Sequence, residues 1–579
     1  MECADRTAQL YENYKGVLKN AVEGQVVTRF PPEPSGYLHI GHIKAAMLNY
    51  HYSKMYKGKM ILRFDDTNPV KETQEFVDNI LKDLENLEIF PDVQTHTSDY
   101  FAQILEMCEK LISEGKAYMD NTSVEEMRRQ RNEGIESLCR NTSVEENLAI
   151  WKEFIQGNQP DYCVRGKISV DDKNKCMRDP VFYRFTDAKH IRTGDAFKVY
   201  PTYDFACPIV DSLEGVTHCL RSSEFNDRNP MYHWILKALD MRDLEIFDYS
   251  RLNLVNTVLS KRKLQKLVDT GVVEGWFDPR FPTVQGILRR GLQVQTLKEF
   301  MLEQGPSRNT VLMDWSVLWS KNKQLIDPIA PRYTAISSEN FCLVELTNGP
   351  EEHYQEEHPL HQKNSDLGNT KVTFYKQVLV EYDDAKNIQA GEKVTFMKWG
   401  NAVIDSIGTE TSEVFKGQPV KLKLTGRLTL EDKDFKKTKK LTWLSAVEEL
   451  LSPLNLIEFD VLITKAKVEE TDNFDELINH NSKFETKAFG SPDLRNLAPN
   501  SVFQLERRGF YIIDSQSETS VNMIFIPDGK TKGMSSLGSK VDPKSTAQGS
   551  EQKLSKKQQA RAAKKAKKQQ AKEESKKEE

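Results

Sequence analysis

The spacing of apolar residues changes twice within residues 26–69, and each change predicts a different element. Residues 26–30 form a short β-branched run, which is typical of a strand. The prolines of residues 31–34 then end both strand and helix, because a proline ring fixes φ and removes an N–H group. Apolar residues recur at helical spacing over 38–56, and 60–64 has the pattern of a second strand. This order predicts a βαβ unit with two parallel strands and a right-handed crossover.

The periodicity of the rest of the chain changes in blocks. Residues 73–87 have the pattern of an amphipathic helix, again after a strand. Polar helical segments and one strand-like run fill 100–199, and short apolar strands return over 200–221. Helical spacing dominates 263–331, whereas 333–514 has a period of two with turn residues between the runs. That last pattern predicts antiparallel β-barrels.

These blocks divide the chain into seven predicted segments. They are a leader (1–24), the first half of a nucleotide-binding α/β domain (25–99), an insertion (100–199), the second half of the α/β domain (200–262), a helical connector (263–332), the β-barrels (333–535) and a Lys-rich tail (536–579). We expect the tail to be disordered, because it has too few large apolar residues to form a core.

Composition and charge exclude several classes of protein. No apolar run approaches the roughly 18 residues that a membrane span needs, and the N-terminus lacks a signal-peptide core, so a cytoplasmic protein is expected. The eight cysteines include no C-x-x-C pair, so neither a disulfide framework nor a structural zinc is expected. The net charge is −5, and residues 551–579 contribute about +6, which leaves an acidic body. Such a body can hold RNA only by gathering lysine and arginine in local patches.

Two histidines begin the predicted helix 38–56. His39 and His42 are three residues apart, so both imidazoles lie on one face near the electropositive helix N-terminus. Gly41 between them has no side chain, which leaves room for a flat ring to pack on the backbone. A triphosphate attacked at its α-phosphorus would meet free N–H groups and two donors there. Taken alone, an H-x-x-H pair is more often a pair of ordinary surface or core histidines.

A second motif lies far along the chain, in residues 253–264. It reads NLVNTVLSKRKL and ends in a polar turn with Ser260 and Lys261. Alone it would be a solvated basic loop. Together, His-Ile-Gly-His and Leu-Ser-Lys resemble the two signatures of class I aminoacyl-tRNA synthetases. The second signature departs from the usual KMSKS at its edges, with Val-Leu before the Ser-Lys pair and Arg after it.

Four long motifs in the same order make the resemblance more specific. They read RFPPEPSGYLHIGH, LRFDDTNP, YPTYDFACPIVDSLEGVTH and NTVLSKRKL. Together they resemble the glutamyl/glutaminyl pair of these synthetases, in its eukaryotic and archaeal branch, over about residues 26–514. The resemblance implies an α/β Rossmann-type catalytic domain with an acceptor-stem-binding insertion, a helical connector and C-terminal β-barrel domains that bind the anticodon.

The resemblance also implies how ATP is held. His39 and His42 stabilise the α-phosphate, and Lys261 is the mobile cation that meets pyrophosphate, so these three are the expected catalytic residues. Eight residues are expected to contact ATP: His39, Gly41, His42, Arg251, Leu252, Leu259, Ser260 and Lys261. Magnesium is expected to arrive with ATP, so we predict no fixed protein ligands for it.

Six residues are implied for the amino-acid pocket: Arg29, Glu33, Asp65, Tyr203, Cys207 and Arg221. Asp65 takes the substrate ammonium group, and Tyr203 hydrogen-bonds near the same end. Arg29 points from the first strand toward the substrate side chain. A strand-end cap for the following turn is the alternative for Asp65 and the preferred interpretation for Asp66.

Arg221 decides between glutamate and glutamine. The glutaminyl enzymes carry an uncharged residue, typically Cys, at this position, and the glutamyl enzymes carry Arg. A γ-carboxylate in a half-buried pocket needs a cation, and a guanidinium can grip it with two hydrogen bonds. The alternative is that Arg221 only holds a neighbour such as Glu224. We expect a glutamate–tRNA ligase that forms glutamyl-AMP and transfers glutamate to the 3′ end of tRNA-Glu.

Several basic segments are candidates for tRNA contact, each with a solvated surface as its alternative. Residues 176–185 supply arginines and aromatics that suit the tRNA 3′ end. Residues 278–291 resemble the helical connector beneath the Leu-Ser-Lys loop and end in Arg-Arg-Gly, and lysines of 436–440 precede Trp443. The expected partners are tRNA-Glu and L-glutamate, with other synthetases or scaffold proteins as candidates and no membrane.

Three alternatives stay open. The nearest is a glutaminyl-tRNA synthetase, against which Arg221 and the segment 278–286 argue. A catalytically silent tRNA-binding scaffold would have no need to keep the two histidines, Lys261 and Asp65. A tRNA-modifying glutamylation enzyme without anticodon recognition would be much shorter than this chain.

Overall fold

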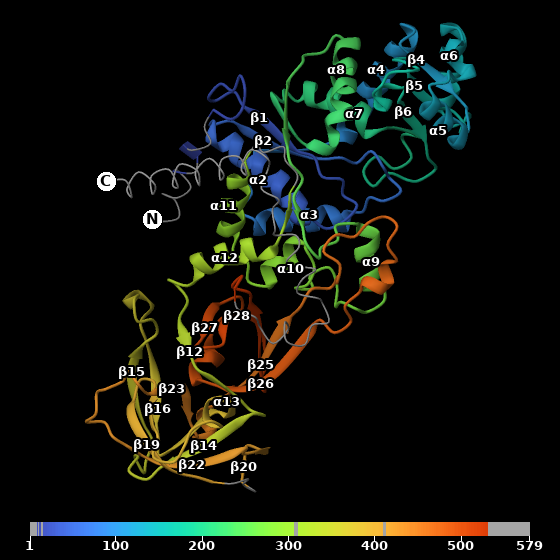
Figure 1. Ribbon diagram of the computed structural model, residues 1–579. Coiled ribbons are helices and arrows are strands. Elements are labelled where there is room, and N and C mark those ends of the chain that lie inside the picture. Colours follow the sequence, from blue (N-terminus) through green and yellow to red (C-terminus); the bar gives the residue numbers. More distant parts are fainter. Residues whose placement is uncertain (1–8, 10, 13–15, 306–310, 409–412, 531–579) are drawn as a thin grey trace, which may run out of the picture. The chain divides into compact units, whose positions relative to one another are not determined.

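The computed structural model describes residues 9, 11–12, 16–305, 311–408 and 413–530. The chain separates into two compact units, residues 1–252 with 259–310 and residues 253–258 with 311–579 (Figure 1). The whole predicted tail and part of the predicted leader lie outside the described residues. Within the described ranges, no helix is long and apolar enough to cross a lipid bilayer.

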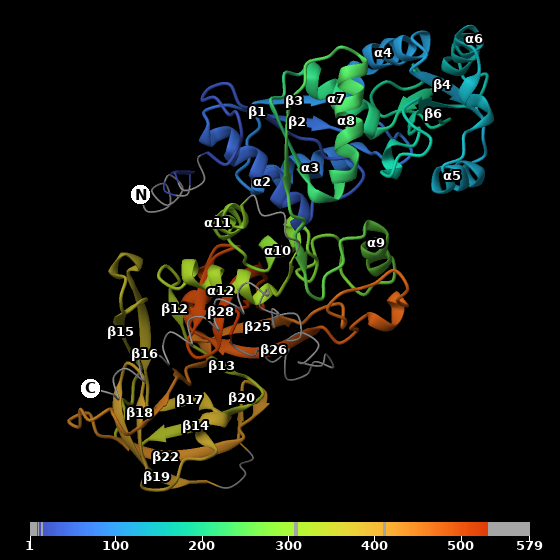
Figure 2. The same ribbon diagram turned by 45° about the horizontal axis from the view of Figure 1, so that its top comes forward.

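The first unit is built on a parallel sheet. Strands β1 (Val27–Phe30), β2 (Lys59–Phe64) and β3 (Val93–His96) pair in parallel, as do β8 (His218–Ser222) and β9 (Glu245–Tyr249). The N–H of Thr217 donates to the carbonyl of Val27 at 3.0 Å, which sets the start of β8 beside the start of β1. Figure 2 shows β1, β2 and β3 side by side. With β8 next to β1, the resulting order β3-β2-β1-β8-β9 is that of a Rossmann-type sheet, whose ligands bind at the carboxyl ends of the strands.

The predicted βαβ unit is confirmed. Helix α2 (Ile40–Met55) joins β1 to β2, and its Leu48 and Tyr52 pack against Leu220 of β8 in one apolar cluster. Helix α3 (Gln74–Asn86) then joins β2 to β3, as the amphipathic pattern predicts. Its N-cap Thr73 accepts a hydrogen bond from the N–H of Phe76, which fixes where the helix begins.

The insertion forms an antiparallel sheet of its own. The strands follow in the order β4 (Ala117–Asp120), β5 (Cys163–Gly166), β6 (Val181–Phe185) and β7 (Val199–Pro201), and the helices are α4 (Phe101–Ser113), α5 (Val124–Glu133) and α6 (Val144–Ile155). Trp151, Phe182 and Tyr183 lie in its core. The same core continues into α7 (Tyr203–Leu213) and α8 (Asn229–Ala238) of the α/β domain.

The expectation of short strands throughout residues 200–221 is wrong. Only the ends of that segment, in β7 and β8, are strands, and Tyr203–Leu213 is the helix α7. Nearly every side of α7 is buried, so the polar face that would have revealed a helical period is missing. Pro208 lies inside the helix, where a proline ordinarily argues against one.

Three further helices complete the first unit: α9 (Lys261–Asp269), α10 (Val284–Arg289) and α11 (Val294–Gln304). The second unit begins with the pair β10 (Asn253–Leu254) and β11 (Leu312–Met313) and with α12 (Trp315–Ile326). The predicted connector, 263–332, is therefore helical but is shared between the two units.

The second unit contains two barrel-like sheets of seven strands among its described residues. One has the order β23 (Lys439–Leu441), β18 (Lys393–Phe396), β19 (Gly400–Ile407), β22 (Leu422–Leu428), β14 (Phe341–Leu346), β17 (Gln377–Glu381), β24 (Trp443–Ser445). The other has the order β12 (Arg332–Tyr333), β27 (Val502–Leu505), β28 (Gly509–Gln516), β29 (Val521–Ile526), β25 (Ser452–Phe459), β26 (Lys483–Gly490), β13 (Ala335–Ser337). Smaller elements are α13 (Tyr382–Ala385) and the hairpins β15 (Tyr354–Pro359) with β16 (Asn369–Phe374) and β20 (Val414–Phe415) with β21 (Gln418–Pro419).

The period of two predicted these strands, but the sheets are not purely antiparallel. The pairs β14–β22, β25–β29, β12–β27 and β18–β23 are parallel. Each parallel pair joins strands that are far apart in the sequence, so turn residues between neighbouring runs give no sign of it.

Candidate active site

Two histidines stand at the start of α2, as the sequence predicts. His39 is the N-cap: its Nδ1 accepts from the N–H of Gly41 at 3.1 Å, and its own N–H donates to Nδ1 of His42 at 3.2 Å. The two rings stack with centroids 3.8 Å apart and an angle of 21° between their planes. Because both Nδ1 atoms accept, each neutral ring carries its proton on Nε2.

Burial keeps both rings neutral. It lowers the pKa of His42 to about 4, and it lowers the pKa of His39 well below the ordinary value, with His42 and Arg251 acting in the same direction. At neutral pH the pair therefore offers hydrogen-bond donors rather than positive charges. The first N–H groups of α2 already have partners within the chain, but the positive end of the helix dipole also points here, so the site suits an anion.

A segment distant in the sequence fixes this helix start. The N–H of Ile40 donates to the carbonyl of Pro282 at 2.8 Å, and the N–H of Val284 donates to the carbonyl of Leu38 at 3.0 Å. Residues 282–284 therefore pair with the H-x-x-H segment through an isolated bridge between His39 and Thr283, and the helix expected within 278–291 is limited to α10.

A cavity of about 430 Å³ opens beside the two histidines, at the carboxyl ends of β1, β2 and β8. Eleven of the predicted site residues line it: Arg29, Glu33, His39, Gly41, His42, Asp65, Tyr203, Arg221, Arg251, Leu252 and Leu259. Three predicted residues do not line it: Cys207, Ser260 and Lys261. The cavity has the size of a small-molecule site, and the parallel sheet places it where such sites occur.

Lys261 lies against α3 and not in the cavity. Its Nζ sits 4.3 Å from the centroid of the Phe76 ring, and its side chain covers Gly36, where an added Cβ would come within 3.1 Å of Cδ of Lys261. Burial lowers the pKa of this lysine, against the opposing effect of Glu33. Ser260 is the N-cap of α9 and makes no side-chain capping bond. For Lys261 to meet a phosphate in the cavity, its side chain must leave the Phe76 ring.

Arg29 and Cys207 belong to a buried charge network under the cavity. Arg29 donates from Nε to both carboxylate oxygens of Asp211 at 3.0 Å, and its Nη2 contacts Sγ of Cys207 at 3.6 Å. Arg63 also binds Asp211, and it binds Glu214 at 2.7 Å. Burial alone would raise the pKa of Asp211, but the two guanidinium groups hold it well below its usual range. Two arginines and two carboxylates thus cancel one another's charge.

Arg221 is not part of this charge network. Its side chain is only 4% exposed, and among the described residues it forms no ion pair with a carboxylate. Nη1 donates to Oδ1 of Asn229 at 3.2 Å, while Nε is buried without a hydrogen-bond partner in the described chain. The guanidinium lies over two aromatic rings, 4.7 Å from the centroid of Phe225 and 5.3 Å from that of Tyr232. Arg221 is therefore a buried cation that lines the cavity and has spare donors.

Glu224 is not the partner of Arg221. It forms an ion pair with Arg251 instead, and both of those side chains are about half exposed. The alternative interpretation of Arg221 is therefore wrong on this point. Arg251 lines the cavity as predicted, with its charge already matched by Glu224.

Asp65 and Asp66 face different surroundings. Asp65 lines the cavity, accepts from Oγ1 of Thr67 at 3.0 Å, and has its pKa raised to about 7 by burial first. Asp66 is fully buried and accepts from the N–H of Ser98 at 2.8 Å and from its hydroxyl at 2.6 Å. Asp66 is thus a structural residue, which is the interpretation that the sequence favoured. It caps the turn after β3, however, and not the turn after β2 in which it lies.

Sequence reasoning missed several residues of the cavity and its floor. Lys44 lines the cavity and donates to the carbonyl of Ser250 at 2.6 Å, and burial lowers its pKa to about 8. Phe225 and Tyr249 also line the cavity, and Asp211 lies beneath it. Lys44 follows His39 by about one and a half helical turns, which is a weak signal. No pattern in the sequence links Asp211 to Arg29, because 182 positions separate them.

The candidate tRNA segments differ in how free their basic groups are. The guanidinium of Arg178 is engaged by backbone carbonyls of the insertion, whereas Arg184 on β6 is exposed. Arg289 pairs with Glu274 at 3.5 Å. Trp443 is buried in its barrel, with Nε1 donating to the carbonyl of Met397 at 2.7 Å, so it is not an exposed aromatic beside the lysines of 436–440.

The chain matches three family models. The model described as tRNA synthetases class I (E and Q), catalytic domain, matches residues 25–328. Two models of the anticodon-binding domain of the same class match residues 330–425 and 440–514. Together they cover both units of the structure.

Curated relatives match most of the chain. A probable cytoplasmic glutamate–tRNA ligase of Schizosaccharomyces pombe is 48% identical over 523 residues, which are 90% of this chain and 72% of that protein. A cytoplasmic glutamate–tRNA ligase of Arabidopsis thaliana is 50% identical, over 89% of this chain and 71% of that protein. A bifunctional glutamate/proline–tRNA ligase of Mus musculus is 47% identical, over 91% of this chain and 35% of that protein.

Proposed function

Because the chain belongs to the class I tRNA synthetases for glutamate and glutamine, we propose that it is a glutamate–tRNA ligase. It uses ATP to activate L-glutamate as glutamyl-AMP and transfers the glutamyl group to the 3′ end of tRNA-Glu. The observation that carries the choice of glutamate is Arg221, a buried guanidinium without a carboxylate partner in the described chain that lines the cavity.

The residues of the cavity suit the activation step. The glutamate α-carboxylate attacks the α-phosphorus of ATP, and pyrophosphate leaves. The Nε2–H groups of His39 and His42, with the N-terminus of α2, would stabilise the charge that grows on the α-phosphate. Lys261 would leave the Phe76 ring to meet the leaving pyrophosphate. No protein nucleophile is needed, because positioning and electrostatics lower the barrier.

At the amino-acid end of the cavity, different residues would bind different groups of the substrate. Asp65 would bind the substrate ammonium group, with Tyr203 beside it. Arg221 would bind the γ-carboxylate. Arg29 would stay paired with Asp211 and form part of the cavity wall. Magnesium bound to the triphosphate supplies further neutralisation of charge. Mg²⁺ keeps several waters and binds substrate phosphates, so we propose that it would arrive with the triphosphate.

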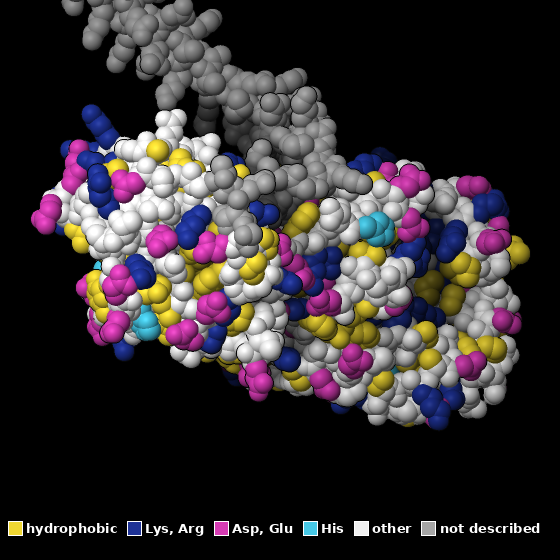
Figure 3. Space-filling model, turned by 90° about the horizontal axis from the view of Figure 1, so that it is seen from below, with side chains coloured by type: hydrophobic (Ala, Val, Ile, Leu, Met, Phe, Trp, Pro, Cys, Tyr) yellow, Lys and Arg dark blue, Asp and Glu magenta, His cyan; other side chains and the backbone are white. Residues whose placement is uncertain are grey.

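Binding of tRNA would draw on local basic groups. On the face shown in Figure 3, lysine and arginine side chains form small groups among aspartate and glutamate. Local patches of this kind are what a chain with a net charge of −5 needs in order to hold phosphates. The barrel-like sheets would bind the anticodon arm, in line with the anticodon-binding models that match them.

The relatives indicate a cellular compartment and candidate partners for this chain. The proteins of fission yeast and Arabidopsis are named cytoplasmic, and we assign this chain to the same compartment. In the mouse relative the glutamate enzyme is joined to a proline enzyme, which makes other synthetases candidate partners of this chain. We propose the acceptor-stem role of residues 100–199 and the role of each site residue on the same basis.

Substrate choice tests the proposal directly. With purified tRNA-Glu present, ATP–pyrophosphate exchange should proceed with glutamate, and glutamine should be used at least about a thousandfold less efficiently, because it leaves a buried cation unpaired. Aminoacylation of tRNA-Glu and tRNA-Gln, each measured separately, identifies the RNA substrate. Prompt exchange with glutamine but not glutamate would reverse the assignment, and no exchange with either would favour a silent tRNA-binding scaffold.

The pH dependence of glutamate binding tests the role of Asp65. Its pKa is raised to about 7, so the carboxyl group is protonated below that pH and cannot pair with the substrate ammonium group. The KM for glutamate should therefore fall as pH rises from 5.5 to about 7 and then level off. The rings of His39 and His42 should not contribute, because burial keeps their pKa values lower. Asp65→Asn should show a high KM whose pH dependence is flattened, and an unchanged profile would contradict this role.

A further inference from the structure

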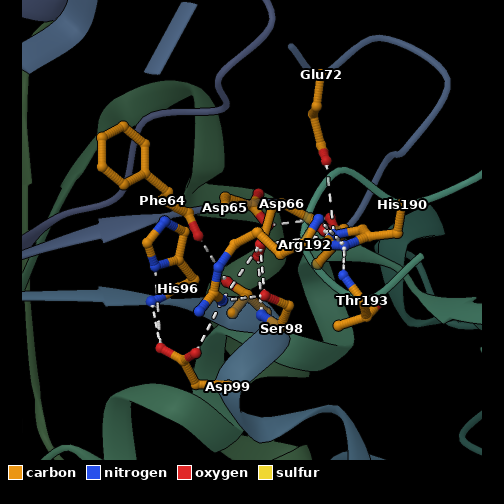
Figure 4. Close-up of polar contacts among 12 residues, drawn as sticks. Phe64, Asp65, Asp66, Glu72, His96, Ser98, Asp99, His190, Arg192 and Thr193 are labelled. Carbon is orange, nitrogen blue, oxygen red and sulfur yellow. Dashed lines mark hydrogen bonds and ion pairs between the residues drawn. The ribbon is translucent and has the colours of Figure 1, made fainter. Parts of the chain in front are cut away.

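A polar cluster with a buried centre connects the insertion to the turn that carries Asp65. Figure 4 shows its members, which come from the end of β2 and the following turn, from η1 (Thr97–Tyr100) after β3, and from the loop before β7. The loop contributes His190, Arg192 and Thr193, and the turn contributes Asp66 and Glu72. None of these five residues lines the cavity, whereas Asp65 does.

His190 holds Asp66 by a bond whose direction is fixed. Its Nδ1 accepts from the N–H of Arg192 at 3.2 Å and from the N–H of Thr193 at 3.1 Å. The ring proton therefore stands on Nε2, which donates to the carbonyl oxygen of Asp66 at 2.8 Å. The side chain of His190 is completely buried, and its ring packs against Phe101. Hydrogen bonds on both nitrogens and packing on the ring hold the imidazole in place, and through it the carbonyl of Asp66.

The carboxylate end of Asp66 is held by Ser98 of η1, and the same loop supports it through Arg192, whose Nη1 lies 3.9 Å from that carboxylate. The carboxylate accepts from Ser98, as described above, and Nη1 of Arg192 reaches the hydroxyl of Ser98 and pairs with Asp99 at 2.8 Å. The backbone carbonyl of Asp66 is thus held directly by His190, and its side chain is held by Ser98 with support from Arg192. Asp65, one residue earlier, accepts from Oγ1 of Thr67, and its N–H donates to the carbonyl of Pro32 at 3.0 Å. Asp65 is therefore held on the side of β1, and Asp66 holds the turn that follows it.

Glu72 closes the turn from the other side. Its Oε1 accepts from the N–H of Asn68 at 2.6 Å, while Oε2 is buried 3.9 Å from Nε2 of His190 with no hydrogen-bond partner among the described residues. The residue is only 4% exposed, and burial raises its pKa to about 8. The bond from Asn68 thus ties Glu72 to the same turn, and its other oxygen faces the ring of His190.

We propose that His190 is a positioning residue for the amino-acid site: by holding Asp66, it fixes the turn that presents Asp65 to the ammonium group of the substrate. The inference rests on the proposed role of Asp65. It makes one loop of the insertion part of the glutamate site, although that loop contributes no side chain to the cavity.

Kinetics of His190 variants test this role in ATP–pyrophosphate exchange with tRNA present. His190→Leu should raise the KM for glutamate by about tenfold and leave the KM for ATP within about twofold, because a misplaced turn affects one substrate only. His190→Gln keeps an N–H near Nε2 and should recover most of the loss. His361→Leu is the matched control: His361 is also buried and accepts at Nδ1 from the N–H two residues ahead, but it lies in the second unit. It should leave both KM values unchanged.

Other outcomes overturn the proposal. An unchanged KM for glutamate in His190→Leu would do so. Equal rises in both KM values, together with a lower melting temperature and no recovery in His190→Gln, would also do so. If His190→Leu does not fold, Arg192→Gln decides, because Arg192 is partly exposed and its loss should raise the KM for glutamate by about threefold. A wild-type enzyme that does not use glutamate at all would refute the proposed function instead.

Discussion

Replacement of Arg221 by cysteine is expected to lower kcat/KM for glutamate by about 30- to 1000-fold, which corresponds to about 2–4 kcal/mol for a buried charge pair. The γ-carboxylate would lose the buried cation that lines the cavity without a carboxylate partner of its own. Arg29 cannot replace it, because both carboxylate oxygens of Asp211 already hold its guanidinium. Steady-state aminoacylation with glutamate and with glutamine measures the effect and shows whether discrimination is lost.

A neighbouring arginine provides the control for Arg221. Arg228 also lies over the Phe225 ring, at 5.3 Å, but it pairs with Asp204 and does not line the cavity. Arg228→Cys should therefore leave kcat/KM for glutamate within about threefold. The Arg221 variant should melt no lower than the wild type, since it removes a desolvated and unpaired charge. A fall in activity that is equal in both variants would show that Arg221 has no special role in recognising glutamate.

Replacement of His42 by asparagine is expected to reduce kcat for glutamyl-AMP formation by about 10²- to 10³-fold, as the loss of one preorganised donor to a developing oxyanion does. Asparagine places an acceptor near Nδ1, so it can still accept from the N–H of His39 and preserve the helix cap. It offers no donor at the position of Nε2. The KM for ATP should change much less than kcat, because the lost hydrogen bond strengthens in the transition state.

Two further His42 variants separate catalysis from the cap. His42→Gln keeps an N–H group near Nε2 and should retain more activity than His42→Asn. His42→Ala removes donor and acceptor together and should in addition destabilise the start of α2 by about 1 kcal/mol. Pre-steady-state formation of glutamyl-AMP and thermal melting measure the two effects. If asparagine and glutamine variants were equally active, the Nε2–H group would have no part in the chemistry.

The sequence alone determined the local structure of the site. Proline, periodicity and β-branched runs placed β1, α2 and β2 to within about two residues, because these signals act between neighbours along the chain. The same signals put His39 and His42 at a helix start and the period-two strands after residue 333. They failed at α7, where burial on nearly every side leaves no polar face to reveal the helix.

Only the tertiary structure decided how charge is distributed in the site. Sequence resemblance brought Arg29, Arg221 and Lys261 forward as cations of the site, but gave no sign of their partners. Folding pairs Arg29 with Asp211, leaves Arg221 without a carboxylate partner in the described chain, and places Lys261 against the Phe76 ring. His190 and Glu72 likewise meet across 118 positions of chain. The physical reason is that a backbone preference is set by residues a few positions apart, whereas the energy of a buried charge depends on whichever groups the fold brings within a few ångströms of it.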